Sequence, residues 1–165
     1  VPSFMTCVNI RPATPEDIGL IFDFVCELAV YEKARQQVTT NEKHLHEALF
    51  GDRPRAYSLI CEVDDEPAGF AVYFYNFSTW LGKYGLFLED LYISPQFRGL
   101  GAGKGLLQHL ARQAVAEGCG RLEWNVLDWN EPAIDFYESC GALAMREWLG
   151  YRLQGDALST FAAGE

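Results

Sequence analysis

The sequence is poor in basic residues. Its 13 Lys and Arg stand against 23 Asp and Glu, which gives a formal net charge of −10 at pH 7. Proteins that bind nucleic acid need positive charge to replace the counterions of the phosphate backbone. A chain this acidic is therefore a poor candidate for a nucleic-acid partner and a better one for attracting cations.

Long apolar segments are missing as well. The longest candidate, residues 18–30, is interrupted by Asp23 and Glu27, and no run approaches the roughly 20 residues that span a bilayer. The sequence does not open with a basic flank followed by an apolar stretch, so we expect no signal peptide. These features predict a cytoplasmic protein without a membrane partner.

Patterns that bind metals are also absent. The five cysteines are scattered along the chain: Cys7, Cys26, Cys61, Cys119 and Cys140. None forms a CxxC pair or a Cys/His pair with zinc spacing. His44 and His46 are two residues apart, which places them on different faces of a helix. The sequence therefore predicts no metal site, and we interpret the cysteines as reduced and mostly buried.

What is present is the composition of a globular domain. Apolar residues make up 49% and charged residues 22% of the 165 residues, which excludes a disordered chain. No repeat, low-complexity segment or linker divides the sequence. We therefore expect a single domain over residues 1–165, with residues 1–5 outside its ordered part.

Residue periodicity predicts an α/β fold. Apolar alternation bounded by turn residues predicts strands over residues 8–12, 56–63, 68–75, 87–93, 121–127 and 148–154. Helical spacing and capping residues predict helices over residues 15–32, 40–50, 106–117 and 130–139. Turn residues at 64–67 predict an antiparallel hairpin between the second and third strands. The predicted order is βααβββαβαβ.

A glycine-rich bend over residues 99–105 follows the strand over residues 87–93. The first turn of a helix has N–H groups without partners inside the helix, and the helix dipole adds positive charge there. Glycines let a ligand approach the backbone closely, so this bend suits phosphate oxygens. Arg98 can add a charge-assisted contact. The alternative is a helix-opening loop that binds no ligand.

Two familiar phosphate motifs do not fit the bend. The Walker pattern GxxxxGK[ST] would place Arg98 at its first glycine, and the Rossmann pattern GxGxxG meets Lys104 where it requires a glycine. The pattern [RQ]xxGx[GA] does fit, through Arg98, Gly101 and Gly103. In this pattern the sequence resembles the acetyl-CoA pyrophosphate loop of the GNAT N-acetyltransferase superfamily.

Blocks on both sides of the bend extend the resemblance. They read Phe-Leu-Glu-Asp-Leu-Tyr-Ile at 87–93, Trp-Asn-Glu-Pro-Ala-Ile-Asp-Phe-Tyr at 129–137, Gly-Ala at 141–142, Tyr-Glu at 31–32 and Trp-Leu-Gly-Lys at 80–83. From residue 10 to residue 158 the chain resembles the spermidine/spermine (diamine) acetyltransferase branch. The resemblance implies a mixed, mostly antiparallel sheet flanked by helices. It also implies direct transfer of an acetyl group from acetyl-CoA to a primary amine in a ternary complex.

By this resemblance, acetyl-CoA contacts the bend, the strand before it and the helix over residues 130–139. The implied contacts are Leu91, Tyr92, Ile93, Arg98, Gly99, Leu100, Gly101, Ala102, Gly103, Lys104, Asn130, Ala133 and Tyr137. The backbone of residues 91–93 would hold the pantetheine arm and donate an N–H group to the oxyanion. Asn130 would contact the arm from the opposite wall, and it is equally well placed to cap the helix that follows it.

Acetyl transfer to an amine requires proton transfer at both ends of the reaction. A free alkylamine has a pKa near ~10, so a carboxylate must take or relay its proton. Glu89 and Asp90 are neighbours in a strand and should point to opposite sides of it. The resemblance assigns the base or amine-binding role to Glu89 and makes Tyr137 the acid that protonates the CoA thiolate. The alternatives are a solvated or salt-bridged Glu89 and a tyrosine of the core.

Acidic and aromatic side chains suit a flexible cationic substrate. By the resemblance, the substrate-binding residues are Tyr31, Glu32, Trp80, Glu89, Glu123, Trp124 and Asn125. The branch usually has an acid directly before the glycine of its last strand, where this chain has Leu149; Glu147 lies two residues earlier, on the same strand face. This departure favours a shorter diamine, or an ornithine-, lysine- or thialysine-like amine, over a long polyamine.

Two other functions fit the same motifs. A GNAT enzyme that acetylates an aminoglycoside or a protein N-terminus would use the same loop and Tyr137. A non-catalytic CoA-binding module would use the loop alone, and it would not need the pair Glu89 and Tyr137. Members of the diamine branch are typically homodimers, so we expect a homodimer.

Overall fold

The computed structural model describes residues 5–164, whose contacts divide the chain into two units, Val1–Asn125 and Val126–Glu165. Residues 1–5 were predicted to lie outside the ordered domain. Of these, residues 1–4 lie outside the described residues. Met5 is the first described residue, and its side chain is exposed.

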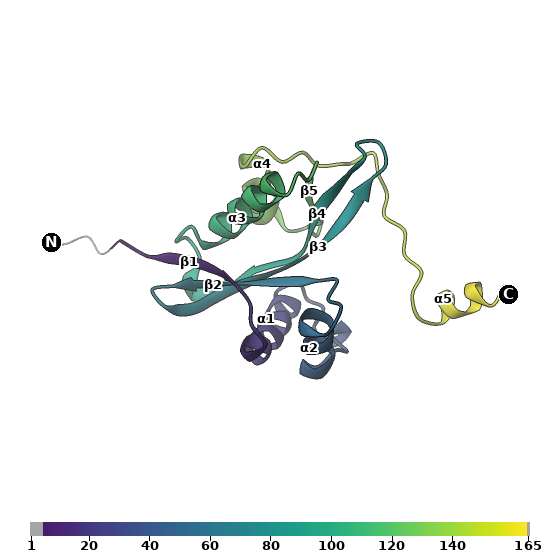
Figure 1. The fold of residues 1–165 in the computed structure, drawn as a ribbon, viewed down its shortest axis with the longest axis horizontal. Coiled ribbons are helices and arrows are strands. Elements are labelled where there is room, and N and C mark those ends of the chain that lie inside the picture. Colours follow the sequence, from purple (N-terminus) through teal and green to yellow (C-terminus); the bar gives the residue numbers. More distant parts are fainter. Residues whose placement is uncertain (1–4, 165) are drawn as a thin grey trace. The chain divides into compact units, whose positions relative to one another are not determined.

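One mixed sheet forms the centre of the first unit (Figure 1). Within residues 5–164 it contains β1 (Val8–Pro12), β2 (Tyr57–Val63), β3 (Glu66–Ser78), β4 (Lys83–Ile93) and β5 (Leu122–Trp124), in that spatial order. The first four strands pair antiparallel, and β5 pairs with β4 in parallel. The predicted mixed, mostly antiparallel α/β fold is confirmed.

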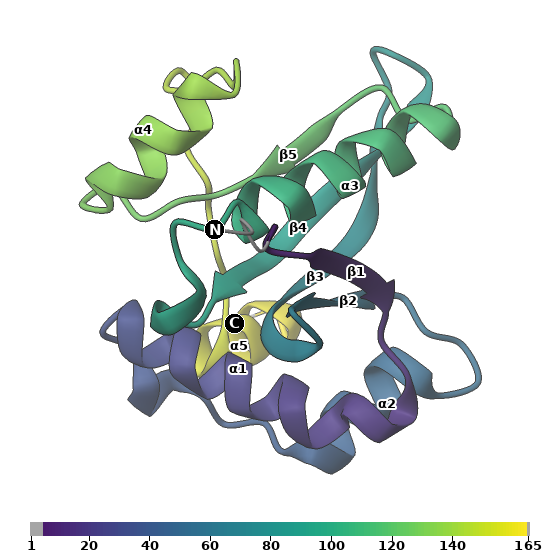
Figure 2. The same ribbon diagram turned by 90° about the vertical axis from the view of Figure 1, so that its left-hand side faces the viewer.

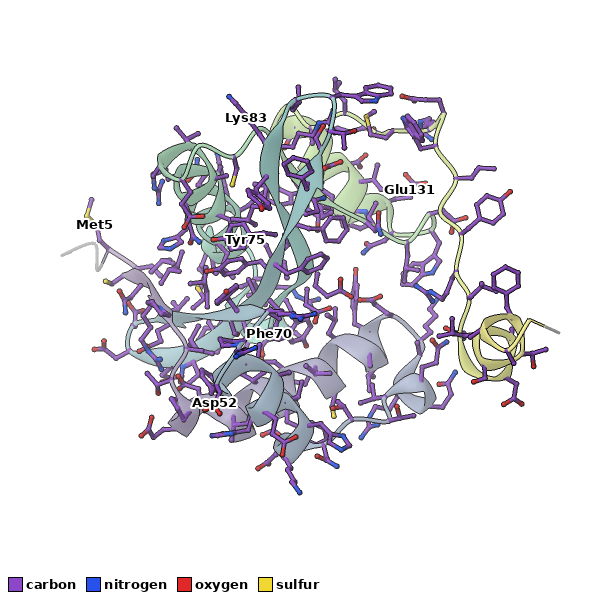
Figure 3. All side chains as sticks on the ribbon, turned by 45° about the vertical axis from the view of Figure 1, so that its right-hand side comes forward. Met5, Asp52, Phe70, Tyr75, Lys83 and Glu131 are labelled. Carbon is purple, nitrogen blue, oxygen red and sulfur yellow. The ribbon has the colours of Figure 1, made fainter. Side chains whose placement is uncertain are left out.

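Helices cover both faces of the sheet (Figure 2). The first face carries α1 (Ile18–Tyr31) and α2 (Glu42–Phe50), and the second carries α3 (Ala102–Ala116). The core of the first face consists of Ile21, Phe24, Leu49, Ile60, Phe70 and Tyr92. The rings of Phe24 and Phe70 stack there with centroids 5.5 Å apart. Phe70, which is labelled in Figure 3, is fully buried at the middle of β3.

Most predicted elements of the first unit form with shifted ends. The hairpin of β2 and β3 is confirmed, with Asp64 and Asp65 both at positive φ in its turn. β3 and β4 are longer than predicted because they continue to pair up to the turn before Lys83. β5 is shorter than the predicted 121–127 because only three of its residues find a partner on β4. α3 begins at Ala102, so the last residues of the predicted bend form its first turn.

The second unit contains α4 (Glu131–Ser139) and α5 (Gly155–Ala162). The predicted strand over residues 148–154 is wrong, because this segment has no strand pairing among the described residues. A strand exists only through its partner, and the alternation of residues 148–154 does not supply one. Trp148 and Tyr151 are exposed instead, the latter to 93%. Sequence reasoning did not predict α5, in which Leu158 and Phe161 share one helix face.

The cysteines are free thiols, but they are less buried than the sequence predicted. Cys61, in the middle of β2, is fully buried. Cys7 and Cys140 are exposed, because the first precedes β1 and the second is the C-cap of α4. The prediction that the cysteines are mostly buried is therefore wrong. Residues at the ends of elements do not share the burial of residues inside them.

Candidate active site

The glycine-rich bend connects β4 to α3 and requires two of its glycines. Gly99 and Gly101 have φ angles of +77° and +83°, a region in which a Cβ is strained. Gly101 is the N-cap of α3, and the first bond of the helix runs from the Gly105 N–H to the Gly101 carbonyl at 2.8 Å. The N–H groups of residues 102–104 precede this bond, so the bend has the donors that an anion needs.

Arg98, at the start of the bend, is held by the elements beside it. Its Nε donates to the carbonyl of Ile93 at 2.9 Å. Its guanidinium lies 5.1 Å from the ring centroid of Tyr31 and 5.6 Å from that of Tyr92. Such distances correspond to cation–π contacts. Arg98 therefore connects the bend to the end of α1.

β4 contains a β-bulge at Glu89. Across the hairpin, Val72 pairs with Asp90, and the next residue of β3, Tyr73, pairs with Leu88. Glu89 is thus an extra residue in β4, with no counterpart on β3. A bulge of this kind interrupts the alternation of side chains along a strand.

The bulge changes the expected orientation of the two acids. Phe87 pairs with Phe74 and Asp90 pairs with Val72, and Phe74 and Val72 lie on the same face of β3. Asp90 therefore lies on the face of Phe87, and alternation from Phe87 places Glu89 on that face as well. The expectation that Glu89 and Asp90 point to opposite sides is wrong, because it assumed an unbroken strand.

Three carboxylates interact on this face. The pKa of Asp90 is raised to about 7, first by burial and then by the negative charges of Glu89 and Glu32. The pKa of Glu32 is raised by burial and, to a smaller extent, by the charge of Glu89. Glu32 is the C-cap of α1, where the helix dipole is negative. Carboxylates that repel one another in a partly dry site favour a bound proton or a bound cation.

Beyond Leu88, the edge of β4 is open. β5 pairs with β4 only over Leu86–Leu88. The remaining residues of β4, including the predicted contacts Leu91, Tyr92 and Ile93, pair with β3 alone among the described residues. Apart from the Ile93 carbonyl, which accepts from Arg98, their backbone groups that point away from β3 are therefore available to an extended ligand. This edge leads directly into the bend.

β5 carries two of the predicted substrate residues, Glu123 and Trp124, and a third, Asn125, directly follows it. Glu123 pairs with Phe87 and so lies on the face of Glu89. Its Oε1 accepts a hydrogen bond from Asn76 Nδ2 at 3.3 Å. Trp124 is the next residue and lies opposite Leu88, and Asn125 follows the strand.

Trp80 lies elsewhere in the first unit. It is in the turn between β3 and β4, before Lys83, and is 82% exposed. Glu89 lies six residues beyond Lys83, the first residue of β4, which corresponds to roughly 20 Å of extended strand. Within one chain, the structure does not bring Trp80 next to the three carboxylates.

In the second unit, three predicted residues share one face of α4. Asn130 occupies its N-cap position, although the Asn130 side chain makes no capping hydrogen bond, and Pro132 lies in its first turn. Ala133 and Tyr137 follow Asn130 at spacings of three and seven residues, which place them on the same face. Tyr137 is half-buried, with its ring centroid 5.5 Å from that of Phe136.

Sequence reasoning gave the base or amine-binding role to Glu89 and did not predict that Asp90 lies on the same face. A signal for the bulge was present in the sequence. Leu88 and Leu91 pair with Tyr73 and Ala71, and so lie on the same face although they are three residues apart. A regular strand would place them on opposite faces, so this apolar spacing indicates the extra residue.

Comparison with known proteins identifies the family. The sequence profile of the Acetyltransferase (GNAT) family matches residues 25–142, which include β2 to β5, the bend and α4. The chain belongs to the GNAT acetyltransferase family. The predicted family and the class of enzyme, an acetyltransferase, are thereby confirmed.

Similar proteins cover almost the whole of this GNAT acetyltransferase. A thialysine N-epsilon-acetyltransferase of Bos taurus is 36% identical over 169 residues, covering 96% of this chain and 99% of that protein. An L-ornithine N5-acetyltransferase of Arabidopsis thaliana is 32% identical, covering 91% of this chain and 86% of that protein. A solved structure, an integron cassette protein from the mobile metagenome of V. cholerae, has a TM-score of 0.78 and 29% identity, with 94% and 97% of the two chains covered.

Proposed function

We propose that the protein transfers the acetyl group of acetyl-CoA to a primary amine of a small cationic substrate, directly in a ternary complex. The observation that carries this proposal is the group of interacting carboxylates, Glu32, Glu89 and Asp90, next to the open edge of β4. Neighbouring carboxylates repel one another, and a bound ammonium ion relieves that repulsion. The family's acetyl donor supplies the second reactant.

The residues of the first unit fit acetyl-CoA. The N–H groups at the start of α3 and the left-handed Gly99 and Gly101 suit its pyrophosphate. The open edge of β4 suits the amide groups of the pantetheine arm, which can hydrogen-bond as a strand would. Acetyl-CoA supplies an acetyl thioester, whose C–S bond breaks as the new C–N bond forms.

The residues of the chain move the protons. Glu89 takes or relays the proton of the bound ammonium, so that the amine nitrogen has a free electron pair. A backbone N–H of residues 91–93 stabilises the negative charge that develops on the carbonyl oxygen. Tyr137 donates its hydroxyl proton to the departing thiolate, and solvent then returns a proton to Tyr137. The role of Tyr137 rests on the family resemblance of its block.

The substrate class follows from the acids that are present and the one that is absent. Glu32, Glu89 and Glu123 lie on elements around the first face, and Leu149 stands where the diamine branch usually has an acid. Fewer carboxylates hold fewer ammonium groups, so a short substrate with one or two amines is favoured. The names of the thialysine and ornithine acetyltransferases, to which the chain is similar, agree with this choice.

Mass spectrometry of the products formed from acetyl-CoA and a panel of amines tests the proposal. The panel contains thialysine, ornithine, lysine, 1,4-diaminobutane, spermidine, an aminoglycoside and a peptide N-terminus. We expect acetylation of the short amines and its loss in Glu89→Gln, whereas Glu66→Gln, at an exposed position of β3, keeps wild-type turnover. Preference for the aminoglycoside or peptide contradicts the substrate class. Tight binding of acetyl-CoA without turnover on any amine indicates the non-catalytic module instead.

We also propose that the protein is a cytoplasmic homodimer. The second unit exposes large apolar side chains, namely Leu143, Met145, Trp148, Leu149, Tyr151, Leu153, Leu158 and Phe161. Apolar surface of this extent is typical of an interface. Light scattering with size-exclusion chromatography tests the assembly, and Trp148→Ser should shift the mass toward the monomer. Among residues 5–164, no helix is long and apolar enough to cross a membrane.

A further inference from the structure

The second face of the sheet carries a tyrosine cluster that the proposed reaction does not use. Tyr57 and Tyr73 are paired across β2 and β3, and their rings stack with centroids 5.5 Å apart. Tyr75 packs edge-on against Tyr73, at an interplanar angle of 85°. Tyr73 pairs with Leu88, so the cluster lies on the face that α3 covers, opposite the face of Asp90.

Hydrogen bonds fix this cluster to α3. The Nε2 of Gln113 donates to the hydroxyl oxygens of Tyr73 and Tyr75, at 3.0 and 3.1 Å. The Tyr75 hydroxyl in turn donates to Oε2 of Glu117 at 2.6 Å. Burial, and then this bond to Glu117, raise the pKa of Tyr75, so its hydroxyl keeps its proton and remains a donor. One oxygen of the Glu117 carboxylate is therefore held by Tyr75 before any ligand arrives.

A hollow of about 330 Å³ opens beside this carboxylate, lined by Tyr75, Tyr84, Glu117 and Cys119. Tyr75, labelled in Figure 3, comes from β3, and Tyr84 comes from β4. The ring of Tyr84 is itself supported by Phe77, at a centroid distance of 5.1 Å. The hollow is more open than enclosed, so it suits a small molecule or one end of a longer one.

Three features of the hollow favour a positive charge. Glu117 is negative, and no ion pair neutralises it among the residues from 5 to 164. It is also the C-cap residue of α3, at the negative end of a 15-residue helix. Two aromatic residues, Tyr75 and Tyr84, line the hollow, and aromatic rings attract cations and alkyl groups.

We propose that this hollow binds the ammonium group of a small primary alkylamine, at a site separate from the active-site carboxylates. Glu117 Oε1 accepts from the ammonium, and the rings of Tyr75 and Tyr84 contact its alkyl chain. Recognition needs one charged group and a short chain, because the lining offers one carboxylate. The site does not depend on the proposed acetyl transfer, since binding here involves none of the residues assigned to that reaction.

Two-dimensional NMR of the full chain with ring-labelled tyrosine tests the site, with 1,4-diaminobutane as the probe. An exposed site of this kind predicts a dissociation constant of about 1–10 mM. The resonances of Tyr75 and Tyr84 should shift and saturate together, and the Tyr84 signal is assigned by its loss in Tyr84→Leu. Glu117→Gln should weaken the binding read from Tyr84 by about two- to five-fold. Glu66→Gln, a matched change at an exposed glutamate, should leave it unchanged.

The same titration separates this site from the active site. In Glu89→Gln, the shifts of Tyr84 should persist with the wild-type midpoint, whatever becomes of acetyl transfer. Butan-1-ol, which has the chain without the charge, should not shift the tyrosine signals. The proposal is overturned if Tyr84 does not respond up to ten times the expected dissociation constant, or if Glu117→Gln leaves the midpoint as in the wild type. If Glu117→Gln fails to fold, Tyr84→Leu replaces it, and the Tyr75 signal then reports the binding. Weaker binding in Tyr84→Leu supports the site, and a wild-type midpoint overturns the proposal.

Discussion

Replacement of Asp90 by asparagine should stabilise the protein at neutral and alkaline pH. The pKa of Asp90 rises from an ordinary value of 3.8 to about 7 in the folded protein. A raised pKa of a carboxyl means that the folded state binds its proton more tightly than the unfolded state does. The contribution of that proton to stability is complete below pH 4 and is lost as the pH rises to about 7.

The difference of about 3 pKa units, at 1.36 kcal/mol each, corresponds to at most about 4 kcal/mol of unfolding free energy. The asparagine side chain cannot ionise, so the variant avoids this loss. Urea unfolding of both proteins at several pH values between 4 and 8 measures the effect. We expect a small difference at pH 4 and an advantage for Asp90→Asn that grows to a plateau above pH 7. A difference that is independent of pH would refute the burial and charge coupling of Asp90.

Three further predictions concern the loop, the acid and the core. Tyr137→Phe keeps the ring and removes the proton, so kcat should fall by about 100-fold or more with unchanged acetyl-CoA affinity; wild-type turnover contradicts its role. Gly101→Ala, at φ +83°, should destabilise by about 1–2 kcal/mol in urea unfolding and weaken acetyl-CoA binding in calorimetry. Gly103→Ala, whose Cβ meets only ordinary contacts, serves as its stability control. Phe70→Ala empties a fully buried site and should cost about 3–5 kcal/mol, and a loss below about 1 kcal/mol argues against that core.

Local patterns were sufficient to predict much of the first unit. The strand at Val8–Pro12, the hairpin of β2 and β3 and the glycine bend each depend on residues close in sequence, such as turn acids, alternating apolar residues and left-handed glycines. The convergence of Glu32 with Glu89 and Asp90 depends on packing of α1 against the sheet, together with a one-residue bulge. Such tertiary effects have only weak local signals.

In the second unit, local sequence patterns were not sufficient for a correct prediction. Residues 148–154 have the alternation of a strand and form none in the single chain, because pairing is a property of two segments. α5 follows them with a short amphipathic pattern of only two large apolar residues, Leu158 and Phe161. Eight-residue helices of this kind give little periodicity on which to base a prediction.

The open edge of β4 has a consequence for the protein before it meets its reactants. Unpaired backbone groups along a strand are a template on which another chain can add a strand, and such edges promote aggregation. A pantetheine arm bound along residues 91–93 would occupy that template and complete the sheet from outside the polypeptide. Bound acetyl-CoA would then act as an edge strand that can dissociate. The resistance of the protein to heat and aggregation should therefore rise in proportion to the logarithm of the acetyl-CoA concentration.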